Sequence, residues 1–436
     1  MGALRRYAAR IARFSPSARA YLLYSLLTSL SWNMFNLVFN LYIHALGYGP
    51  DFVGLLNGLP SVAVLLLGLP VGLAADRLGY RPFLLAGTVL NLVATAGLGL
   101  AHGSLELIVL SALTGAAGAL SWVIGAPMMA AYSSPEERVY LFSVNESIMF
   151  GSGLAGSLLA GAVPAYAAAR LGQRSTDALP LQLAFGLIDL FNLLALWPAL
   201  RIGLEPRSDG SPSAAPAGAP RLAWRDLLPA DREEARTFAR LLLPEALIAF
   251  GAGAMVVFFQ LYFYLEFGLD TSRIGLLFGF SSVVTAAATL VAPVLAERWG
   301  AVRTVVGTQL ASLPFLAILA YSRDLRWVVV AYYARNALMN MSMPVQTTFA
   351  LEQVSERRRA TLTSLNAMLG SLGRGGLGPL ASGYLQLHSG FSGAFTLTIA
   401  CYLVGTLLFG WFFRGRGGGR PARKPAPRPA GPDLTS

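Results

Sequence analysis

Two arginines fall inside long apolar runs of this chain, where they are well placed to bind a charged ligand. Arg335 lies in the run 327–350, and Arg374 lies in the run 361–387. If both runs cross a membrane as helices rising ~1.5 Å per residue, the two guanidinium groups reach nearly the same depth. Like charges at one depth repel, so we expect them to face a cavity that favours anionic or zwitterionic ligands. The alternative is that each arginine bonds to backbone carbonyls or to a buried acid.

Carboxamides form a second polar group inside the apolar runs. Asn33, Asn36 and Asn40 recur every three or four residues, which places them on one face of a helix over 21–46. Gln260 falls near the position related to Asn40 in the second half of the chain. Such a face lines a cavity or bonds to a neighbouring helix, where each interhelical amide bond contributes about 0.6 to 2 kcal/mol. The residues that we expect to line a substrate cavity are Asn33, Asn36, Asn40, Gln260, Arg335, Asn336, Asn340, Asn366 and Arg374.

Acidic residues inside the apolar runs are candidates for proton coupling. This role needs a carboxyl group that is sheltered from bulk water and can bind and release a proton. Glu146 and Asp189 both lie well inside such runs, and we expect them to couple proton movement to transport, with Glu146 as the first candidate. Glu245 is a third candidate. The alternative for Asp189 is that it pairs with a neighbouring helix.

Several kinds of chemistry are excluded by residues that the chain lacks. Lys424 is the only lysine and lies in the C-terminal tail, which excludes the phosphate-binding loop of nucleotide pumps and Schiff-base chemistry. Cys401 is the only cysteine, and His44, His102 and His388 show no metal-ligand spacing. No segment combines a nucleophile, a base and an orienting group. We therefore expect no metal, no cofactor and no enzymatic activity.

The composition is that of an integral membrane protein. Hydrophobic residues make up 55% of the 436 residues and charged residues only 13%, which is more apolar sequence than one soluble core could bury. Because lipid offers no hydrogen-bond partners to bare backbone amides, the long apolar runs must be helices. The predicted fold class is all-α, with twelve transmembrane helices in two pseudo-symmetric six-helix bundles. The predicted helices cover residues 21–46, 52–74, 83–101, 105–130, 140–163, 180–200, 242–266, 273–295, 303–321, 327–350, 361–387 and 391–413.

The net charge of +11 follows a membrane topology. With both termini in the cytoplasm, 26 of the 33 Lys and Arg residues fall on cytoplasmic segments, as the positive-inside rule predicts. The basic tail over 414–436 is interpreted as an anchor on anionic lipid, with binding of single-stranded nucleic acid as the alternative.

The sequence is duplicated at a constant offset, which we call the repeat offset. It maps Gly54 onto Gly275 and, in a separate segment, Asn145 onto Asn366. In many carriers, similar halves of this kind enclose a substrate site between them. We assign residues 1–203 to the first bundle, 204–240 to a cytoplasmic linker with a short surface helix over 226–240, 241–413 to the second bundle, and 414–436 to a disordered tail.

The loop between the second and third predicted helices resembles the signature loop of the major facilitator superfamily. The residues that fit it are Gly72, Asp76, Arg77, Gly79 and Arg81. A degenerate copy in the second half consists of Glu297, Arg298, Gly300 and Arg303. The resemblance covers nearly the whole chain. It implies that both loops latch one bundle to the other, which gives these residues a gating role; the alternative is that their charges are solvated topology signals.

The same resemblance implies a secondary transporter that moves a small organic solute by alternating access. We expect proton-coupled efflux of drugs or metabolites across a bacterial inner membrane, by a monomer with both termini in the cytoplasm. However, the predicted helix over 105–130 lacks the arginine that many proton-coupled drug exporters of the family carry. Import of organic anions or sugars is one alternative, and a membrane sensor or lipid-handling scaffold without transport is another. The expected partners are a small-molecule substrate, protons and membrane lipid, with no nucleic acid.

Overall fold

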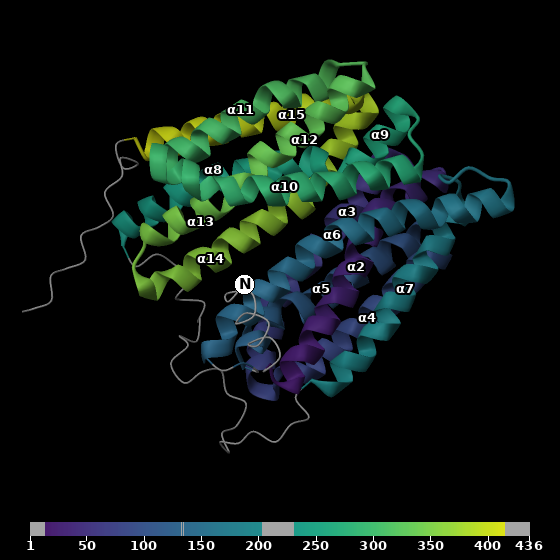
Figure 1. Cartoon of the computed structure of the whole chain (residues 1–436), viewed down its shortest axis with the longest axis horizontal. Coiled ribbons are helices and arrows are strands. Elements are labelled where there is room, and N and C mark those ends of the chain that lie inside the picture. The colour runs from purple at the N-terminus through teal and green to yellow at the C-terminus, as the bar shows by residue number, and fades with distance from the viewer. Residues whose placement is uncertain (1–13, 132, 134, 203–230, 415–436) are drawn as a thin grey trace, which may run out of the picture.

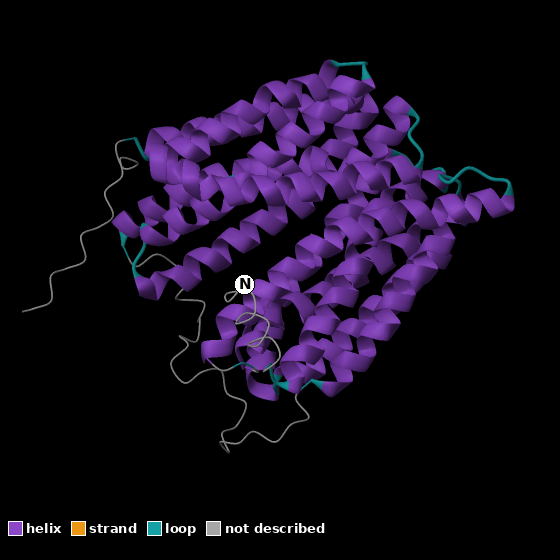
Figure 2. Ribbon diagram, in the orientation of Figure 1, coloured by secondary structure: helices purple, strands orange, loops and turns teal. Residues whose placement is uncertain are grey.

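The computed structural model describes residues 14–131, 133, 135–202 and 231–414, and these residues form helices and short connections without a strand (Figure 2). The first half contains α2 (Pro16–Ala45), α3 (Pro50–Leu78), α4 (Tyr80–Leu100), α5 (Ser104–Ala131), α6 (Pro135–Leu171) and α7 (Ala178–Arg201). The second half contains α8 (Arg232–Met255), η2 (Val256–Phe258), α9 (Phe259–Phe267), α10 (Thr271–Trp299), α11 (Ala301–Tyr321), α12 (Leu325–Met341), α13 (Met343–Glu352), α14 (Glu356–Gly370), η3 (Ser371–Leu377) and α15 (Gly378–Phe412).

The helices have the length and surface of membrane spans. Within the described ranges, ten helical segments are long and apolar enough to cross a membrane. One of them, 361–412, has 52 residues and contains a non-helical Gly390, so it divides into two spans. The pair α12 and α13 is not among these ten segments and corresponds to the predicted run 327–350. Large apolar side chains such as Leu66 and Leu290 point outward and are exposed, as lipid contact requires.

The duplication seen in the sequence also sets the helix boundaries. The repeat offset that carries Gly54 onto Gly275 also carries both ends of α3 onto those of α10, and both ends of α4 onto those of α11. The single residue between the members of each helix pair has nearly the same conformation, with φ 87° and ψ 157° at Gly79 and φ 82° and ψ 154° at Gly300. A positive φ of this size favours glycine. The two halves therefore repeat one local fold.

The two halves form two bundles that meet at one end of the molecule and separate toward the other (Figure 1). At the end that we call closed, the connections 172–177 and 268–270 come together: the backbone N–H of Thr271 donates to the Ser175 hydroxyl over 3.3 Å. At the opposite, open end, α2 begins, α7 ends, α8 begins and α15 ends. The cavity described below lies between the bundles.

Glycines make the closed-end contact close enough for backbones to touch. A Cβ on Gly161 of α6 would lie 2.5 Å from the carbonyl oxygen of Thr271, and a Cβ on Gly54 of α3 would clash with that of Pro379. The Thr271 hydroxyl donates to the Gly161 carbonyl over 2.9 Å. The seam thus consists of α6 against α10 and α3 against α15.

Two spans of the second bundle are interrupted where they face each other. α8 ends at Met255, whose φ is −129°, and passes through the 3₁₀ turn η2 into α9. α14 passes into α15 through the π-helical segment η3. The two interruptions pack so closely together that a Cβ on Gly253 would lie only 2.6 Å from the Gly373 carbonyl oxygen. Short π-helical segments inside helices occur often at functional sites.

The start of the second bundle differs from the sequence expectation. α8 begins at Arg232 and continues into the membrane span, so residues 232–240 are part of that span's helix rather than of a separate surface helix. The Asp231 side chain caps it by accepting a hydrogen bond of 2.7 Å from the Glu234 backbone N–H. Residues 204–230 of the predicted linker and residues 415–436 of the predicted tail lie outside the described residues.

Candidate functional site

A cavity of ≈ 920 Å³ lies between the two bundles and is lined by helices of both. This volume is at the upper end of the range for pockets that enclose a small organic molecule. Aromatic residues form part of the wall: Trp32 and Trp122 meet edge to face with ring centroids 4.8 Å apart. Of the described residues that line the cavity, the charged ones are Arg335, Arg374 and Glu245. Two guanidinium groups and one carboxylate leave an excess positive charge.

Arg335 is held at the cavity wall without a carboxylate partner. Its side chain is 3% exposed and donates over 2.7 Å to the Asn336 side-chain oxygen and over 2.5 Å to the Tyr402 hydroxyl. The guanidinium also lies over the rings of Phe259 and Tyr402, at 5.6 and 5.4 Å from the centroids. Its Nε–H is buried and has no acceptor among the described residues. A buried cation held only by neutral groups retains its attraction for an anion.

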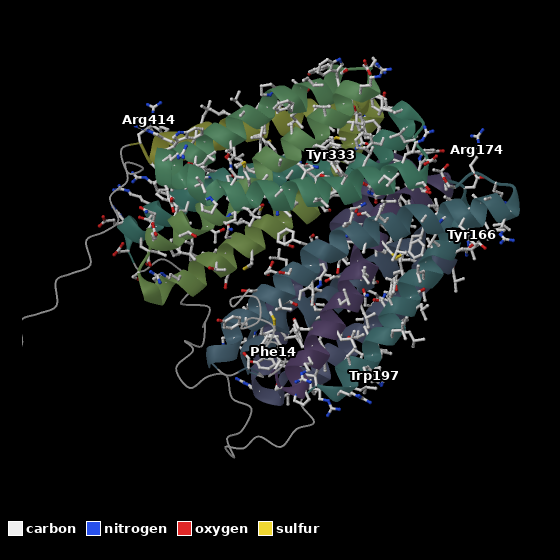
Figure 3. All side chains as sticks on the ribbon, viewed as in Figure 1. Phe14, Tyr166, Arg174, Trp197, Tyr333 and Arg414 are labelled. Carbon is white, nitrogen blue, oxygen red and sulfur yellow. The ribbon has the colours of Figure 1, made fainter. Side chains whose placement is uncertain are left out.

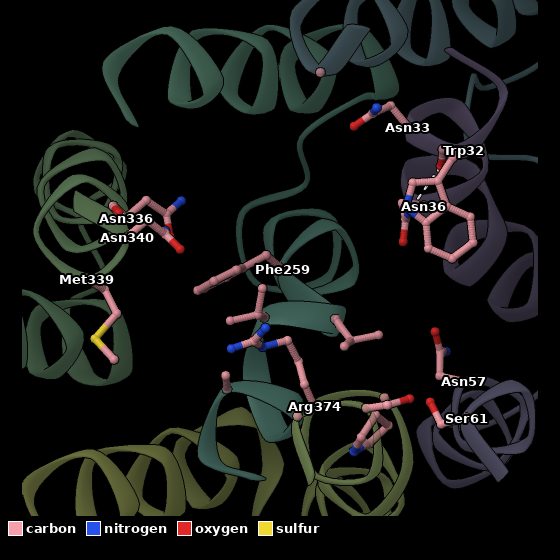
Figure 4. A pocket seen from close by; sticks show the side chains of 18 of the residues that line it. Trp32, Asn33, Asn36, Asn57, Ser61, Phe259, Asn336, Met339, Asn340 and Arg374 are labelled. Atoms are coloured by element: carbon pink, nitrogen blue, oxygen red, sulfur yellow. Dashed lines mark hydrogen bonds between the residues drawn. The ribbon is translucent and has the colours of Figure 1, made fainter. Parts of the chain in front are cut away.

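Arg374 extends from η3 into the cavity. Figure 4 shows its guanidinium beside Phe259, between Asn336 and Asn340 on one side and Asn36 on the other. The side chain is exposed to the cavity space, and no described residue accepts a hydrogen bond from it. Arg374 and Arg335 thus meet in one cavity, as their predicted depths imply.

Glu245 on α8 is the acid of the cavity wall. Its carboxylate accepts a hydrogen bond of 2.9 Å from the Gln346 side chain. Gln346 in turn accepts one of 3.2 Å from Gln309, and Gln309 accepts one of 3.0 Å from the Thr406 hydroxyl. Arg374 lines the same cavity, so its positive charge attracts the Glu245 carboxylate across it. The acid that the sequence ranked third is therefore the one that shares the cavity with both arginines.

The amides of the first bundle divide between the cavity and the helix interface. Asn33 and Asn36 line the cavity, and each bonds to a backbone carbonyl of its own helix over 2.8 Å. Asn40 does not line it: at 1% exposure it donates over 2.6 Å to the Val257 carbonyl and accepts from Asn57 over 2.8 Å. Asn40 of α2 thus links the first bundle to η2 of the second. Bonding to a neighbouring helix is the alternative role that the sequence analysis left open.

The remaining predicted amides all line the cavity. Gln260 donates to the Asn36 carbonyl over 3.1 Å and so also bridges the two bundles. The Asn336 amide donates over 2.9 Å to the Ser281 hydroxyl, and that of Asn340 over 2.8 Å to the Asn336 carbonyl. Asn366 contributes from α14.

Neither of the acids predicted first for proton coupling lines the cavity. Asp189 is partly buried between α7 and α4, where it accepts a hydrogen bond of 2.5 Å from the Thr95 hydroxyl. Glu146 is exposed on α6. Its helical spacing to the cavity residues Met149 and Phe150 puts it on the same face, one turn nearer the open end.

The predicted gating residues lie at the open end, where the bundles are apart. Arg77, Glu297, Arg298 and Arg303 are exposed, and no hydrogen bond joins them to the other bundle within the part of the chain that the structure describes. Arg81 donates over 2.8 Å to the Leu200 carbonyl and thereby fixes the loop to α7 of its own bundle. Gly72 lies within α3, and the glycines Gly79 and Gly300 separate the helices on either side of each loop. The Asp76 side chain lies outside the described residues.

Several cavity residues carry no distinctive sequence signal. Tyr402, Phe259 and Trp122 each lie in an apolar run where an aromatic residue reads as ordinary packing. In the described ranges, no group of three or more His, Cys, Asp or Glu residues is placed to hold a metal ion.

Comparisons with known proteins agree with this architecture. A bacterial homologue of the human lysosomal transporter Spinster, in an inward-facing and unoccupied conformation, superimposes with a TM-score of 0.74 at 18% identity, covering 91% of this chain and 95% of that one. A bacterial homologue of the iron transporter ferroportin, also inward-facing, gives a TM-score of 0.73 at 17% identity, covering 91% and 98%. These likenesses show the fold.

Sequence comparison identifies the family. A multidrug resistance protein, MdtH of Aeromonas hydrophila, is 29% identical over 118 residues, which span 27% of this chain and 30% of that protein. The sequence profile described as Major Facilitator Superfamily matches residues 21–374 and 241–435, which together cover most of the chain. The chain therefore belongs to the Major Facilitator Superfamily and is a multi-pass membrane transporter of solutes.

Proposed function

We propose that the protein is a secondary transporter that carries a small organic anion across the membrane by alternating access. The observation that carries this proposal is the charge of the cavity, whose described lining contains two arginines and a single carboxylate. An intramembrane charge without a partner is costly, so an anion that joins Arg335 and Arg374 gains binding free energy from both. The wall residues Trp32, Trp122 and Phe259 suit an aromatic or otherwise apolar body on that anion.

The way the bundles meet supports alternating access. The cavity is bounded at the closed end by backbone contacts such as those of Gly161 and Gly54. For release on the other side, these contacts have to separate while the open end closes, which rocks one bundle against the other. The gating loops around Gly79 and Gly300 lie where such closure would bring the bundles together.

We place the open end in the cytoplasm of a bacterial cell, with both termini there and the protein acting as a monomer in the inner membrane. The positive-inside rule supports this orientation, because basic residues gather at the open end. They lie near the starts of α2 and α8 and near the C-terminal ends of α7 and α15. In Figure 3, Arg414, Phe14 and Trp197 lie toward this end, and Arg174 and Tyr166 lie toward the other.

Proton-coupled efflux of drugs or metabolites is the second candidate function. The match of 118 residues to a multidrug resistance protein favours it. The charge of the cavity favours organic anions, and the direction of their movement depends on how protons are coupled to them.

Transport by purified protein in liposomes tests the proposal. We expect protein-dependent exchange of labelled benzenesulfonate and of other small aromatic anions, and no exchange of trimethylphenylammonium, a cation of similar size. Arg335→Ala and Arg374→Ala should each lower the apparent affinity for the anion by about tenfold or more, since a hydrogen bond to a charged group contributes about 1.5–3 kcal/mol. Preferential cation transport would contradict the proposal. The absence of any solute exchange would favour a sensor or scaffold.

A further inference from the structure

The following inference rests on the anion transport proposed above. We propose that the carboxylate of Glu245 and the transported anion compete for Arg374, so that a proton on Glu245 and an anion at Arg374 occupy the cavity together. The protein would then be a proton–anion symporter, and an inward proton gradient would drive uptake rather than efflux.

The competition arises because Glu245 and Arg374 line the same cavity. Both line the cavity, so their opposite charges attract each other across it. They do not form a direct ion pair, since none of the ion pairs within 4.0 Å among the described residues includes either of them. Arg374 therefore has room to bind another anion, but the negative charge of Glu245 still attracts it.

The surroundings of Glu245 hold few other charges. Arg374 on η3 and Arg335 on α12 are the cations of the shared cavity, and Tyr402 on α15 is bonded to Arg335. Nearer the open end of α8, Glu234 is bonded through two oxygens to Arg358 at the start of α14, so these charges satisfy each other. The ionisation of Glu245 consequently has its main effect on the two cavity arginines.

A directed chain of hydrogen bonds keeps Glu245 in place in both protonation states. Thr406 donates to Gln309, Gln309 donates to Gln346, and Gln346 donates to one oxygen of Glu245. A proton from cavity water can bind to the other carboxylate oxygen without breaking this bond. Protonation therefore removes the negative charge and leaves the geometry of the wall unchanged.

The sign of the coupling follows from the charges. When Glu245 is ionised, an incoming anion is repelled by the carboxylate and must compete with it for Arg374. When Glu245 is protonated, the repulsion is lost and Arg374 is free to bind the anion. By linkage, a bound anion raises the affinity of Glu245 for a proton by the same factor. Proton and anion thus bind and leave together, and no covalent bond of the solute changes.

The test uses the full-length protein in liposomes with benzenesulfonate, which stays ionised between pH 5 and 8, so that any pH effect reports on the protein. With the membrane potential clamped at zero, a gradient of one pH unit should drive about tenfold accumulation if one proton moves with each anion. Glu245→Gln should abolish this accumulation and should make sulfonate exchange at equal pH independent of pH. Asp189→Asn, a matched change of acid to amide outside the cavity, should accumulate sulfonate as the wild type does.

Each result separates this inference from the proposed function. If Glu245→Gln accumulates sulfonate as the wild type does, or if Glu146→Gln abolishes accumulation while Glu245→Gln does not, the inference is overturned and anion transport stands. Wild-type exchange of sulfonate without proton coupling has the same meaning. If Glu245→Gln exchanges nothing, Glu245→Asp decides: retained accumulation supports the inference, and exchange without accumulation overturns it. A wild type that exchanges no anion at all contradicts the proposed function itself.

Discussion

Gly253 lies against the backbone carbonyl of Arg374, so closely that a Cβ on Gly253 would be 2.5 Å from that oxygen. The contact joins the end of α8 to the π-helical segment that aims the Arg374 side chain into the cavity. Because both contacting groups are backbone, neither can rotate away. The position of one binding residue is therefore set by the absence of a side chain on another helix.

We predict that Gly253→Ala moves η3 and weakens anion binding. Overpacking of this kind costs about 1–3 kcal/mol, and the displacement of Arg374 should lower benzenesulfonate affinity by at least tenfold. Equilibrium binding to purified protein measures the effect. Gly186→Ala is the control, because no atom lies within 4 Å of a Cβ at Gly186. Equal affinities in the two variants would show that the contact does not position Arg374.

Tyr402→Phe should weaken anion binding through Arg335. The substitution removes the hydroxyl that accepts a hydrogen bond from the guanidinium, and leaves the ring in place beneath it. A hydrogen bond to a charged group contributes about 1.5–3 kcal/mol. Without it the Arg335 guanidinium is held less firmly, and the affinity for the anion should fall roughly tenfold or more. Tyr333→Phe, on the same helix as Arg335, is the control for loss of a hydroxyl. Titration with labelled benzenesulfonate measures the affinity of each variant. If Tyr402→Phe and Tyr333→Phe both bound the anion as tightly as the wild type does, Tyr402 would not have this role.

Gly161→Val should open the closed end. The new side chain would clash with the backbone of Thr271 and with Gly275, which lies 3.2 Å from the position of a Cβ on Gly161. We expect the variant to lose gradient-driven transport, because solute would escape on both sides. A cysteine introduced at Ser157, which lines the cavity, reports this opening. An impermeant maleimide added from the closed side should label it faster in combination with Gly161→Val, because the seam then stays open instead of opening only during the transport cycle. The native Cys401 is buried, which keeps the background low. Equal labelling with and without the valine would show that Gly161 does not seal the seam.

The ion pair between Glu234 and Arg358 should stabilise the second bundle as a unit. Both side chains are largely buried, at 18% and 17% exposure, and the guanidinium also lies 5.7 Å from the centroid of the Phe238 ring. Arg358→Ala should lower the midpoint of thermal unfolding, because the largely buried Glu234 carboxylate loses this ion pair. The double variant Glu234→Ala with Arg358→Ala should melt no lower than the single one. Additive losses would mean that the two residues act independently.

Much of the architecture could be predicted because lipid imposes a simple rule on sequence. Every predicted apolar run corresponds to a helical span, and the repeat offset reappears in the boundaries of α3 and α10. The cavity could be anticipated for a similar reason. A guanidinium such as that of Arg335, inside an apolar run, must face protein or water rather than lipid.

What the sequence could not give was the partner of each polar group. Asn33 and Asn40 lie on one helix face, yet Asn33 reaches the cavity and Asn40 bonds to the Val257 carbonyl of η2. Asp189 has a mid-membrane position like that of a coupling acid, but Thr95 of the neighbouring helix satisfies it. The interruptions at η2 and η3 depend on backbone contacts across helices, which no local pattern encodes.

The location of a bound anion tests the central claim most directly. A structure of the protein with 4-bromobenzenesulfonate, determined with the anomalous signal of bromine, would place the molecule without reference to transport. The account predicts a sulfonate group within hydrogen-bond reach of Arg374 or Arg335, with the ring against Phe259 or Trp32. Binding only at the basic surface of the open end, or an empty cavity at concentrations that saturate exchange, would contradict it.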